Sequence, residues 1–172
     1  MVIWLIGLSG AGKTTVGRHL VDLWKATAPN TVLVDGDDIR ALYGLDKSPE
    51  AHTVEGRRVN AQRITDLCQW LDGQGINVVC AILSLFPEMR QENRRRFSRY
   101  FEVYLKVPMS ELKHRDSKGL YSAAARGEMF NVVGVDIPFP EPGAADLVVE
   151  NFGPVSDPKE QARRIFEAAS PR

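Results

Sequence analysis

The segment that most constrains this chain is residues 7–14, which read Gly-Leu-Ser-Gly-Ala-Gly-Lys-Thr. It follows a continuous apolar run at residues 2–6, and apolar residues recur at helical spacing over residues 13–26. Glycines between a strand and a helix let backbone N–H groups turn inward around phosphates, and the helix start adds a positive dipole. In such a P-loop, Lys13 reaches the β- and γ-phosphates and Thr14 ligates magnesium. The segment therefore predicts a site for a nucleoside triphosphate with Mg²⁺.

The rest of the chain alternates short β-branched runs with longer segments of helical periodicity. Strands are predicted at residues 2–6, 31–34, 76–83, 101–107 and 147–149, and helices at residues 13–26, 54–72, 87–98 and 158–169. Alternation of this kind is typical of a parallel sheet covered by helices. The predicted fold is an α/β three-layer sandwich of the P-loop NTPase type. It has a central parallel five-stranded sheet with helices on both faces.

Length and composition limit the number of domains, the kinds of partner and the cellular compartment that we expect. The 172 residues are enough for one domain, and 22 basic residues balance 22 acidic ones, so no global field favours nucleic acid. The apolar start, residues 1–6, is too short for a signal peptide or a membrane span. Cys68 and Cys80 have no metal or redox spacing, which favours a reducing cytoplasm with both thiols buried. Trp24 and Trp70 lie on helical stripes, which predicts that both pack in the core.

Residues 118–142 break the alternation. They combine weak periodicity with several glycines and three prolines. A loop region of this length inside a compact domain is typically a functional lid or a disordered segment. We therefore expect one kinase-type domain over residues 1–172, with a lid at about residues 116–142.

A cluster of carboxylates follows the second predicted strand. Asp35, Asp37 and Asp38 lie at the carboxyl edge of the sheet, where ligands bind in folds of this type. One aspartate can hold water around magnesium, and another can take a proton from a substrate hydroxyl. Arg40, about one helical turn after Asp37, can clamp an anionic substrate. The alternative is a set of helix N-capping residues, which explains one aspartate more readily than three.

Three further motifs are shared with one enzyme family. Residues 35–40 (Asp-Gly-Asp-Asp-Ile-Arg), 57–60 (Arg-x-x-Asn) and 115–121 (Arg-Asp-Ser-Lys-Gly-Leu-Tyr) resemble those of the adenylylsulfate kinases. The resemblance runs from Gly7 to about Asp146. Members of this family use ATP to phosphorylate the 3′-hydroxyl of adenosine 5′-phosphosulfate. The resemblance therefore implies a nucleotide 3′-kinase with a small-molecule acceptor and no nucleic-acid or membrane partner. Relatives are often homodimers.

The resemblance also implies roles for single residues. Asp37 inherits the role of general base, and Lys13 and Lys118 neutralise phosphate charge when the lid closes and excludes water. The residues implied to hold ATP are Gly7, Ser9, Gly10, Ala11, Gly12, Lys13, Thr14, Thr15 and Arg115. Those implied to hold the acceptor are Asp35, Arg40, Arg57, Asn60, Ser84, Lys118, Gly119, Leu120 and Val132. Thr14 and Asp35 are implied at the magnesium ion.

Departures from the family pattern gather at the acceptor base. The family sandwiches adenine between two phenylalanines, one after the aspartate motif and one in the lid. Here the corresponding stretches are residues 43–48 (Tyr-Gly-Leu-Asp-Lys-Ser) and 132–135 (Val-Val-Gly-Val), which lack both rings. Stacking contributes about 1–3 kcal/mol per base, so adenine binding is expected to weaken.

Two acceptors remain open. Family size favours adenylylsulfate, with Tyr43, Phe86 or Phe130 holding the base. The alternative is another nucleotide, of which cytidine diphosphoramidate is the sharpest candidate, because a smaller pyrimidine suits an aliphatic slot. A function of a different class is a P-loop regulator that binds nucleotide without turnover. The acceptor-site residues Asp37, Arg40, Arg57 and Lys118 argue against a pure binder.

Overall fold

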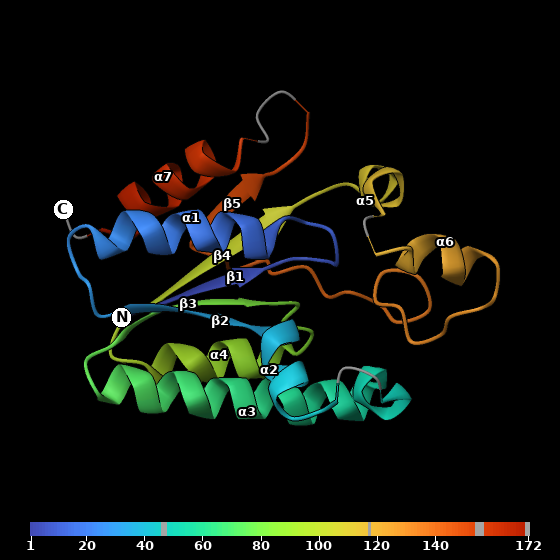
Figure 1. The fold of residues 1–172 in the computed structure, drawn as a ribbon, viewed down its shortest axis with the longest axis horizontal. Helices are drawn as coiled ribbons and strands as arrows, with labels where there is room; N and C mark the ends of the chain where they lie inside the picture. Colours follow the sequence, from blue (N-terminus) through green and yellow to red (C-terminus); the bar gives the residue numbers. More distant parts are fainter. Residues whose placement is uncertain (46–47, 117, 154–156, 171–172) are drawn as a thin grey trace.

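The computed structural model describes residues 1–45, 48–116, 118–153 and 157–170, so residue 117 of the predicted lid lies outside the described part. Its centre is a five-stranded sheet in the order β2-β3-β1-β4-β5, with every strand pair parallel (Figure 1). The strands are β1 (Val2–Ile6), β2 (Thr31–Asp35), β3 (Asn77–Ile82), β4 (Tyr100–Lys106) and β5 (Leu147–Glu150). This confirms the predicted fold class, and the strand bounds differ from the prediction by one or two residues at most.

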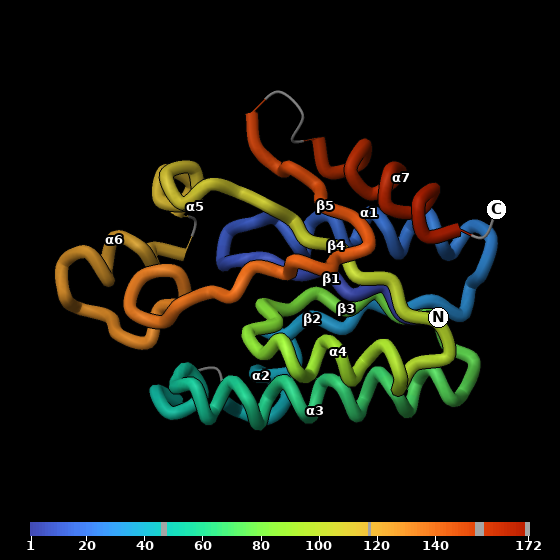
Figure 2. Tube along the Cα trace, turned by 180° about the vertical axis from the view of Figure 1, so that it is seen from behind, coloured from blue at the N-terminus to red at the C-terminus, as the bar shows by residue number. Residues whose placement is uncertain are grey.

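Helices cover both faces of the sheet (Figures 1 and 2). One face carries α1 (Lys13–Lys25) and α7 (Pro158–Ala169), and the other carries α2 (Gly36–Leu42), α3 (Val54–Gly73) and α4 (Pro87–Arg96). A 3₁₀ helix, η1 (Pro49–His52), precedes α3. Two short helices, α5 (Met109–Arg115) and α6 (Leu120–Ala125), lie beyond the carboxyl ends of the strands, at the end away from both termini.

The central strand explains how the sheet is buried on both sides. All five residues of β1 are buried, and they divide by parity between two cores. Ile3 and Leu5 pack in the core under α1 and α7, whereas Val2, Trp4 and Ile6 pack in the core that contains Ile64 and Cys68 of α3. Because side chains alternate along a strand, a run that is apolar on both faces needs a helical layer on each side. β1 therefore fixes the P-loop at the centre of the carboxyl edge.

The sequence analysis missed two short helices, and its prediction for one tryptophan was wrong. Residues 109–115 and 120–125 form helices, which the sequence did not predict because six or seven residues are too few for a helical period to show. Trp70 is 63% exposed, while Trp4 and Trp24 are buried. The apolar stripe of α3 is narrow, and Trp70 lies outside it. Cys68 and Cys80 are buried as expected. Among the helices of the described residues, none has the length and apolar character that a membrane-spanning segment needs.

Candidate active site

The P-loop joins β1 to α1 in a conformation that depends on its glycines. Gly10 and Gly12 have φ of 77° and 88°, values that favour glycine. A Cβ on Gly7 would lie 2.9 Å from the carbonyl oxygen of Leu105, so this position also excludes larger residues. The Lys13 ammonium donates hydrogen bonds of 2.9 Å to the carbonyl oxygens of Gly7 and Leu8. The loop thus curves around Lys13, the residue that is predicted to bind the phosphates.

Lys13 has an unusual protonation equilibrium. Desolvation lowers its pKa to about 8, and the nearby Asp35 carboxylate offsets only part of that effect. The lysine therefore remains mostly charged at neutral pH but titrates within a unit or two above it. A bound triphosphate favours the charged form, because opposite charges at short range stabilise the ammonium.

Thr14 and Asp35 meet at the carboxyl edge. The Thr14 hydroxyl donates a 2.6 Å hydrogen bond to one oxygen of Asp35, whose other oxygen accepts the backbone N–H of Asp37 at 2.8 Å. Asp35 is thus the N-cap of α2 as well as the partner of Thr14, and its side chain is buried. The two roles considered for the aspartates, helix capping and magnesium binding, therefore both fall on Asp35. Both predicted magnesium residues lie together.

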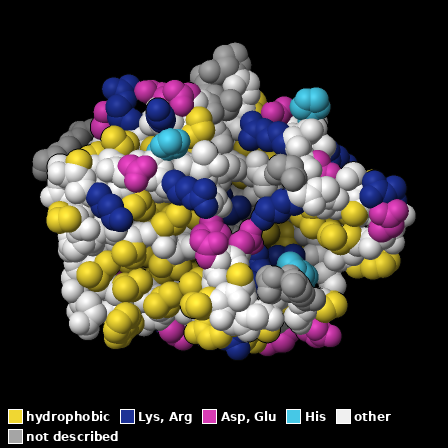
Figure 3. All heavy atoms as spheres, viewed as in Figure 1, with side chains coloured by type: hydrophobic (Ala, Val, Ile, Leu, Met, Phe, Trp, Pro, Cys, Tyr) yellow, Lys and Arg dark blue, Asp and Glu magenta, His cyan; other side chains and the backbone are white. Residues whose placement is uncertain are grey.

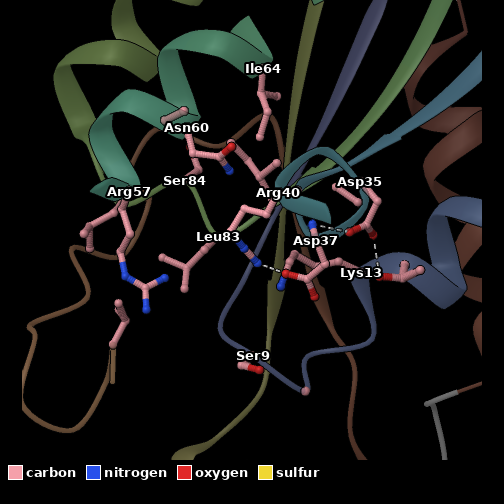
Figure 4. A pocket seen from close by; sticks show the side chains of 18 of the residues that line it. Ser9, Lys13, Asp35, Asp37, Arg40, Arg57, Asn60, Ile64, Leu83 and Ser84 are labelled. Carbon is pink, nitrogen blue, oxygen red and sulfur yellow. Dashed lines mark hydrogen bonds and ion pairs between the residues drawn. The ribbon is translucent and has the colours of Figure 1, made fainter. Parts of the chain in front are cut away.

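Asp37 lies in the first turn of α2 and faces two cations. Its carboxylate forms an ion pair with Arg40 on the same helix (Figure 4) and another with Lys118 from the lid. Burial lowers the pKa of Arg40, and Asp35 partly counteracts this. Asp37 is about half exposed, so its carboxylate stays accessible to a substrate. The arrangement joins the predicted general base to one cation from the α2 side and one from the lid.

The lid lies over this edge through contacts to three other parts of the site. Lys118 contacts α2, the Tyr121 hydroxyl donates to the carbonyl oxygen of Ser9 at 2.9 Å, and Arg57 of α3 donates to the carbonyl oxygen of Asn131 at 2.9 Å. Asp116 accepts the backbone N–H groups of Tyr121 and Ser122, which caps α6. The lid thus contacts the P-loop, α2 and α3 and covers the edge between them.

Beneath the lid is a cavity of about 470 Å³ that runs from the P-loop to α3. In the space-filling view, basic and acidic side chains gather around the hollow between the sheet edge and the lid (Figure 3). Most of the predicted residues line the cavity, namely Ser9, Gly10, Gly12, Lys13, Thr14, Thr15, Asp35, Asp37, Arg40, Arg57, Asn60, Ser84, Lys118 and Leu120. Residues from distant parts of the sequence are thus brought to one place, as the sequence predicted.

The α3 end of the cavity combines aliphatic walls with a few polar groups. Asn60 is 5% exposed, and its amide oxygen has no hydrogen-bond partner among the described residues. Ser84 follows β3 with φ of 57° and accepts a 3.2 Å hydrogen bond from the Trp4 indole. Arg90 donates to the Ser84 carbonyl oxygen at 2.7 Å and holds this strained turn in place. Burial lowers the pKa of Arg57. This end therefore offers a cation, an amide and a hydroxyl beside an apolar slot.

The remaining predicted residues lie outside the cavity lining. Gly7 and Ala11 form the back of the P-loop, and Gly119 begins the turn into α6. Arg115 contacts Glu111 at 3.0 Å and the Asn151 carbonyl oxygen at 2.8 Å. Val132 and Val133 are 1% and 3% exposed and pack in the same core, and of the two only Val133 also lines the cavity. The cavity wall therefore has Val133 where the sequence analysis expected Val132.

Several lining residues carried no signal in the sequence. They are His52, Ala61, Ile64, Leu83, Leu85 and Val133. His52 shows no ligand spacing, and the others are apolar residues whose role depends only on which way the backbone turns them. Of the three aromatic candidates for the acceptor base, Phe86 lines the cavity. Tyr43 is 56% exposed beneath the Arg63 guanidinium, and Phe130 is 74% exposed.

Comparison with known proteins agrees with this geometry. The model of a family described as adenylylsulphate kinase matches residues 1–150. A cytidine diphosphoramidate kinase from Campylobacter jejuni is 40% identical over 87% of this chain and 85% of its own length. An adenylyl-sulfate kinase from Shewanella baltica is 36% identical over 87% of this chain and 73% of its own length.

Among solved structures, the Mycobacterium tuberculosis APS kinase CysC in complex with AMPPNP and APS superposes with a TM-score of 0.83. Its sequence is 28% identical, and the match covers 97% of this chain and 95% of that one. The match therefore extends beyond the P-loop to the lid and the C-terminal helix.

Proposed function

The chain belongs to the adenylylsulphate kinase family and is thus a phosphotransferase, and from that premise we propose that it transfers the γ-phosphoryl group of ATP to the 3′-hydroxyl of cytidine diphosphoramidate. The observation that carries the choice of acceptor is the slot at the α3 end of the cavity. Its walls include Ile64, Leu83, Leu85 and Val133, and Phe86 is its aromatic residue among the described lining residues.

The lining of this slot favours a single-ring base. The two rings that flank adenine in the family are absent, and the structure puts no aromatic side chain in their place from Tyr43 or Phe130. Stacking contributes about 1–3 kcal/mol per base. A purine loses more of this energy than a pyrimidine when its stacking partners are removed, because its two-ring system has the larger contact area. The identity to the cytidine diphosphoramidate kinase of Campylobacter jejuni supports the same choice. Adenosine 5′-phosphosulfate is the second candidate, favoured by the adenylyl-sulfate kinase relatives.

The polar groups suit transfer to a hydroxyl. Asp37 would accept the proton of the 3′-hydroxyl as that oxygen bonds to the γ-phosphorus and the bond to the β-phosphate oxygen breaks, releasing ADP. Lys13 and Lys118 would neutralise the charge on the phosphates, and Arg40 and Arg57 would bind the acceptor's anionic groups. Asp37 is paired with Lys118 before substrate is bound, so an acceptor hydroxyl would have to displace that cation toward the phosphates.

The donor side has the residues that Mg²⁺ requires. Thr14 and Asp35 offer one hydroxyl and one buried carboxylate 2.6 Å apart. The described residues contain no cluster of three or more His, Cys, Asp or Glu side chains suited to a metal. Mg²⁺ commonly binds through few protein groups and takes its other ligands from phosphates and water, so the pair fits. The ion would screen the phosphate charge.

Two buried thiols that form no disulfide, Cys68 and Cys80, suit the cytoplasm as the location we propose.

A side-by-side acceptor assay tests the proposal. ADP release is followed with cytidine diphosphoramidate, with adenosine 5′-phosphosulfate and with neither, and the phosphorylated position is read by ³¹P NMR. We expect kcat/KM to favour the cytidine nucleotide by about ten- to a hundredfold. A preference for adenosine 5′-phosphosulfate would establish the second candidate. ATP binding with no stimulation by either acceptor would favour the non-catalytic regulator.

A further inference from the structure

Asn151 lies beside the P-loop without lining the cavity. It comes directly after β5, at the same carboxyl edge as the end of β1, and only 4% of it is exposed. No motif in the sequence marks it. Its position behind the phosphate loop raises the question of why a buried polar residue is needed there.

The contacts of Asn151 join three separate segments. Its side-chain amide donates a 2.8 Å hydrogen bond to the carbonyl oxygen of Ala11 in the P-loop. Its backbone N–H donates to the carbonyl oxygen of Lys106 at the end of β4, at 3.0 Å. Its own carbonyl oxygen accepts a 2.8 Å hydrogen bond from Arg115, where the lid begins. One residue thus connects the P-loop to the sheet edge and to the start of the lid.

Asn151 also fits against the loop at Gly12. A Cβ added to Gly12 would lie 2.6 Å from the side-chain nitrogen of Asn151, so the amide occupies the space that the glycine leaves open. Gly12 is the N-cap residue of α1 and has no side chain to cap the helix. The residue that follows is Lys13. The amide of Asn151 therefore supports the turn that sets the direction of the lysine.

The polar side chain is retained here at a cost. The Asn151 amide oxygen is buried and has no hydrogen-bond partner among the described residues. Turning the amide over would put this oxygen against the Ala11 carbonyl oxygen, so the observed orientation is fixed by the loop. A buried acceptor without a partner destabilises a fold, whereas an apolar side chain of similar size would fill the space without that penalty. The hydrogen bond to Ala11 is the contact that an apolar residue cannot supply.

We propose that Asn151 is a positioning residue that holds the P-loop in its ATP-receiving conformation and ties that loop to Arg115 at the base of the lid. It acts through the carbonyl group of Ala11 and the turn at Gly12. The inference rests on ATP being the donor in the proposed function, but not on the acceptor.

The test measures binding of AMPPNP with Mg²⁺ by calorimetry in the full chain. Asn151→Ala removes the amide, and Asn151→Asp keeps its shape but loses the donor. We expect both variants to weaken AMPPNP binding by about five- to tenfold. In turnover assays KM for ATP should rise in parallel, while KM for the acceptor and kcat at saturating ATP stay within about threefold.

Asn93→Ala is the matched control, because Asn93 on α4 is equally buried and also has an unpartnered amide oxygen. It should lower the melting temperature without changing AMPPNP affinity. Three outcomes would overturn the proposal. They are unchanged affinity in folded Asn151→Ala, weakening in Asn151→Asp alone (a charge effect), or equal weakening in Asn93→Ala. Wild-type protein that binds AMPPNP but transfers nothing would refute the proposed function and leave this inference standing.

Discussion

The donor half and the acceptor half of the cavity are built in different ways. The donor half centres on one contiguous segment, residues 7–15, in which Gly10 and Gly12 have positive φ and set the course of the backbone, and Asp35 adds one carboxylate from the end of β2. The acceptor half is assembled from α2, α3, the turn after β3 and the lid, and its groups are side chains. Backbone geometry tolerates little change, whereas a side-chain wall can be replaced residue by residue. A family can therefore keep its phosphoryl donor while it changes the acceptor.

Asp37 lies at the junction of the two halves, and its removal has the largest expected effect. Asp37→Ala should lower kcat by about a thousandfold, because the carboxylate is the group placed to take the hydroxyl proton. AMPPNP affinity, measured by calorimetry, should stay within a few-fold of the wild type. Asp38→Ala is the control, since Asp38 lies in the same helical turn but outside the cavity lining. A tenfold or greater loss of AMPPNP affinity in Asp37→Ala would instead place this aspartate at the metal.

Lys118 belongs to the acceptor half by its position but should act on the transferred phosphate. Lys118→Met should lower kcat by about a hundredfold, because it removes a cation from the site of charge development. KM for the acceptor should change much less. Arg126→Met is the comparison variant, because Arg126 is another lid cation of similar exposure, paired with Glu128. Equal losses in both variants would mean that lid charge acts in a general way, and the ion pair between Lys118 and Asp37 would carry no special role.

Asn60 should affect the acceptor half alone. Asn60→Ala should raise the acceptor KM by about tenfold, because the buried amide oxygen has no partner among the described residues and a bound nucleotide would supply one. KM for ATP should not change, which separates the two halves kinetically. Asn93→Ala serves as the control for the loss of a buried amide elsewhere. A rise in KM for ATP in Asn60→Ala would contradict the division of the cavity into two halves.

The same difference explains what the sequence could predict. Short contiguous patterns predicted three features: the P-loop, the burial of β1 on both faces and the position of the aspartates after β2. The structure has all three where they were expected. An aliphatic slot was expected, but its residues could not be predicted, because Leu83, Leu85 and Val133 become wall residues only through the direction of the turn after β3 and of the lid backbone. Val132 and Val133 show this directly, since both valines are buried in the same core and only Val133 also lines the cavity.

Lys13 gives the smallest expected effect and tests whether the donor half is as desolvated as its geometry indicates. The pKa of Lys13 in the ligand-free chain is lowered to about 8, and bound phosphates should raise it. Above pH 8, binding must therefore take up a proton, and AMPPNP affinity should fall as pH rises. Calorimetry in two buffers of different ionisation enthalpy should show clearly more proton uptake at pH 8.5 than at pH 7.0, with binding a few-fold weaker at the higher pH.

The charge of Lys13 can be separated from other pH effects by substitution. In Lys13→Arg the guanidinium stays protonated over this range, so any AMPPNP binding that remains should show no proton uptake. Absence of uptake in the wild type at pH 8.5 would mean that the ammonium stays charged and hydrated in the ligand-free loop. The two hydrogen bonds from Lys13 to the loop carbonyl groups would then not exclude water, and the donor half would become rigid only when nucleotide binds. The contrast with the acceptor half would in that case lie in sequence contiguity alone, and not in preorganisation.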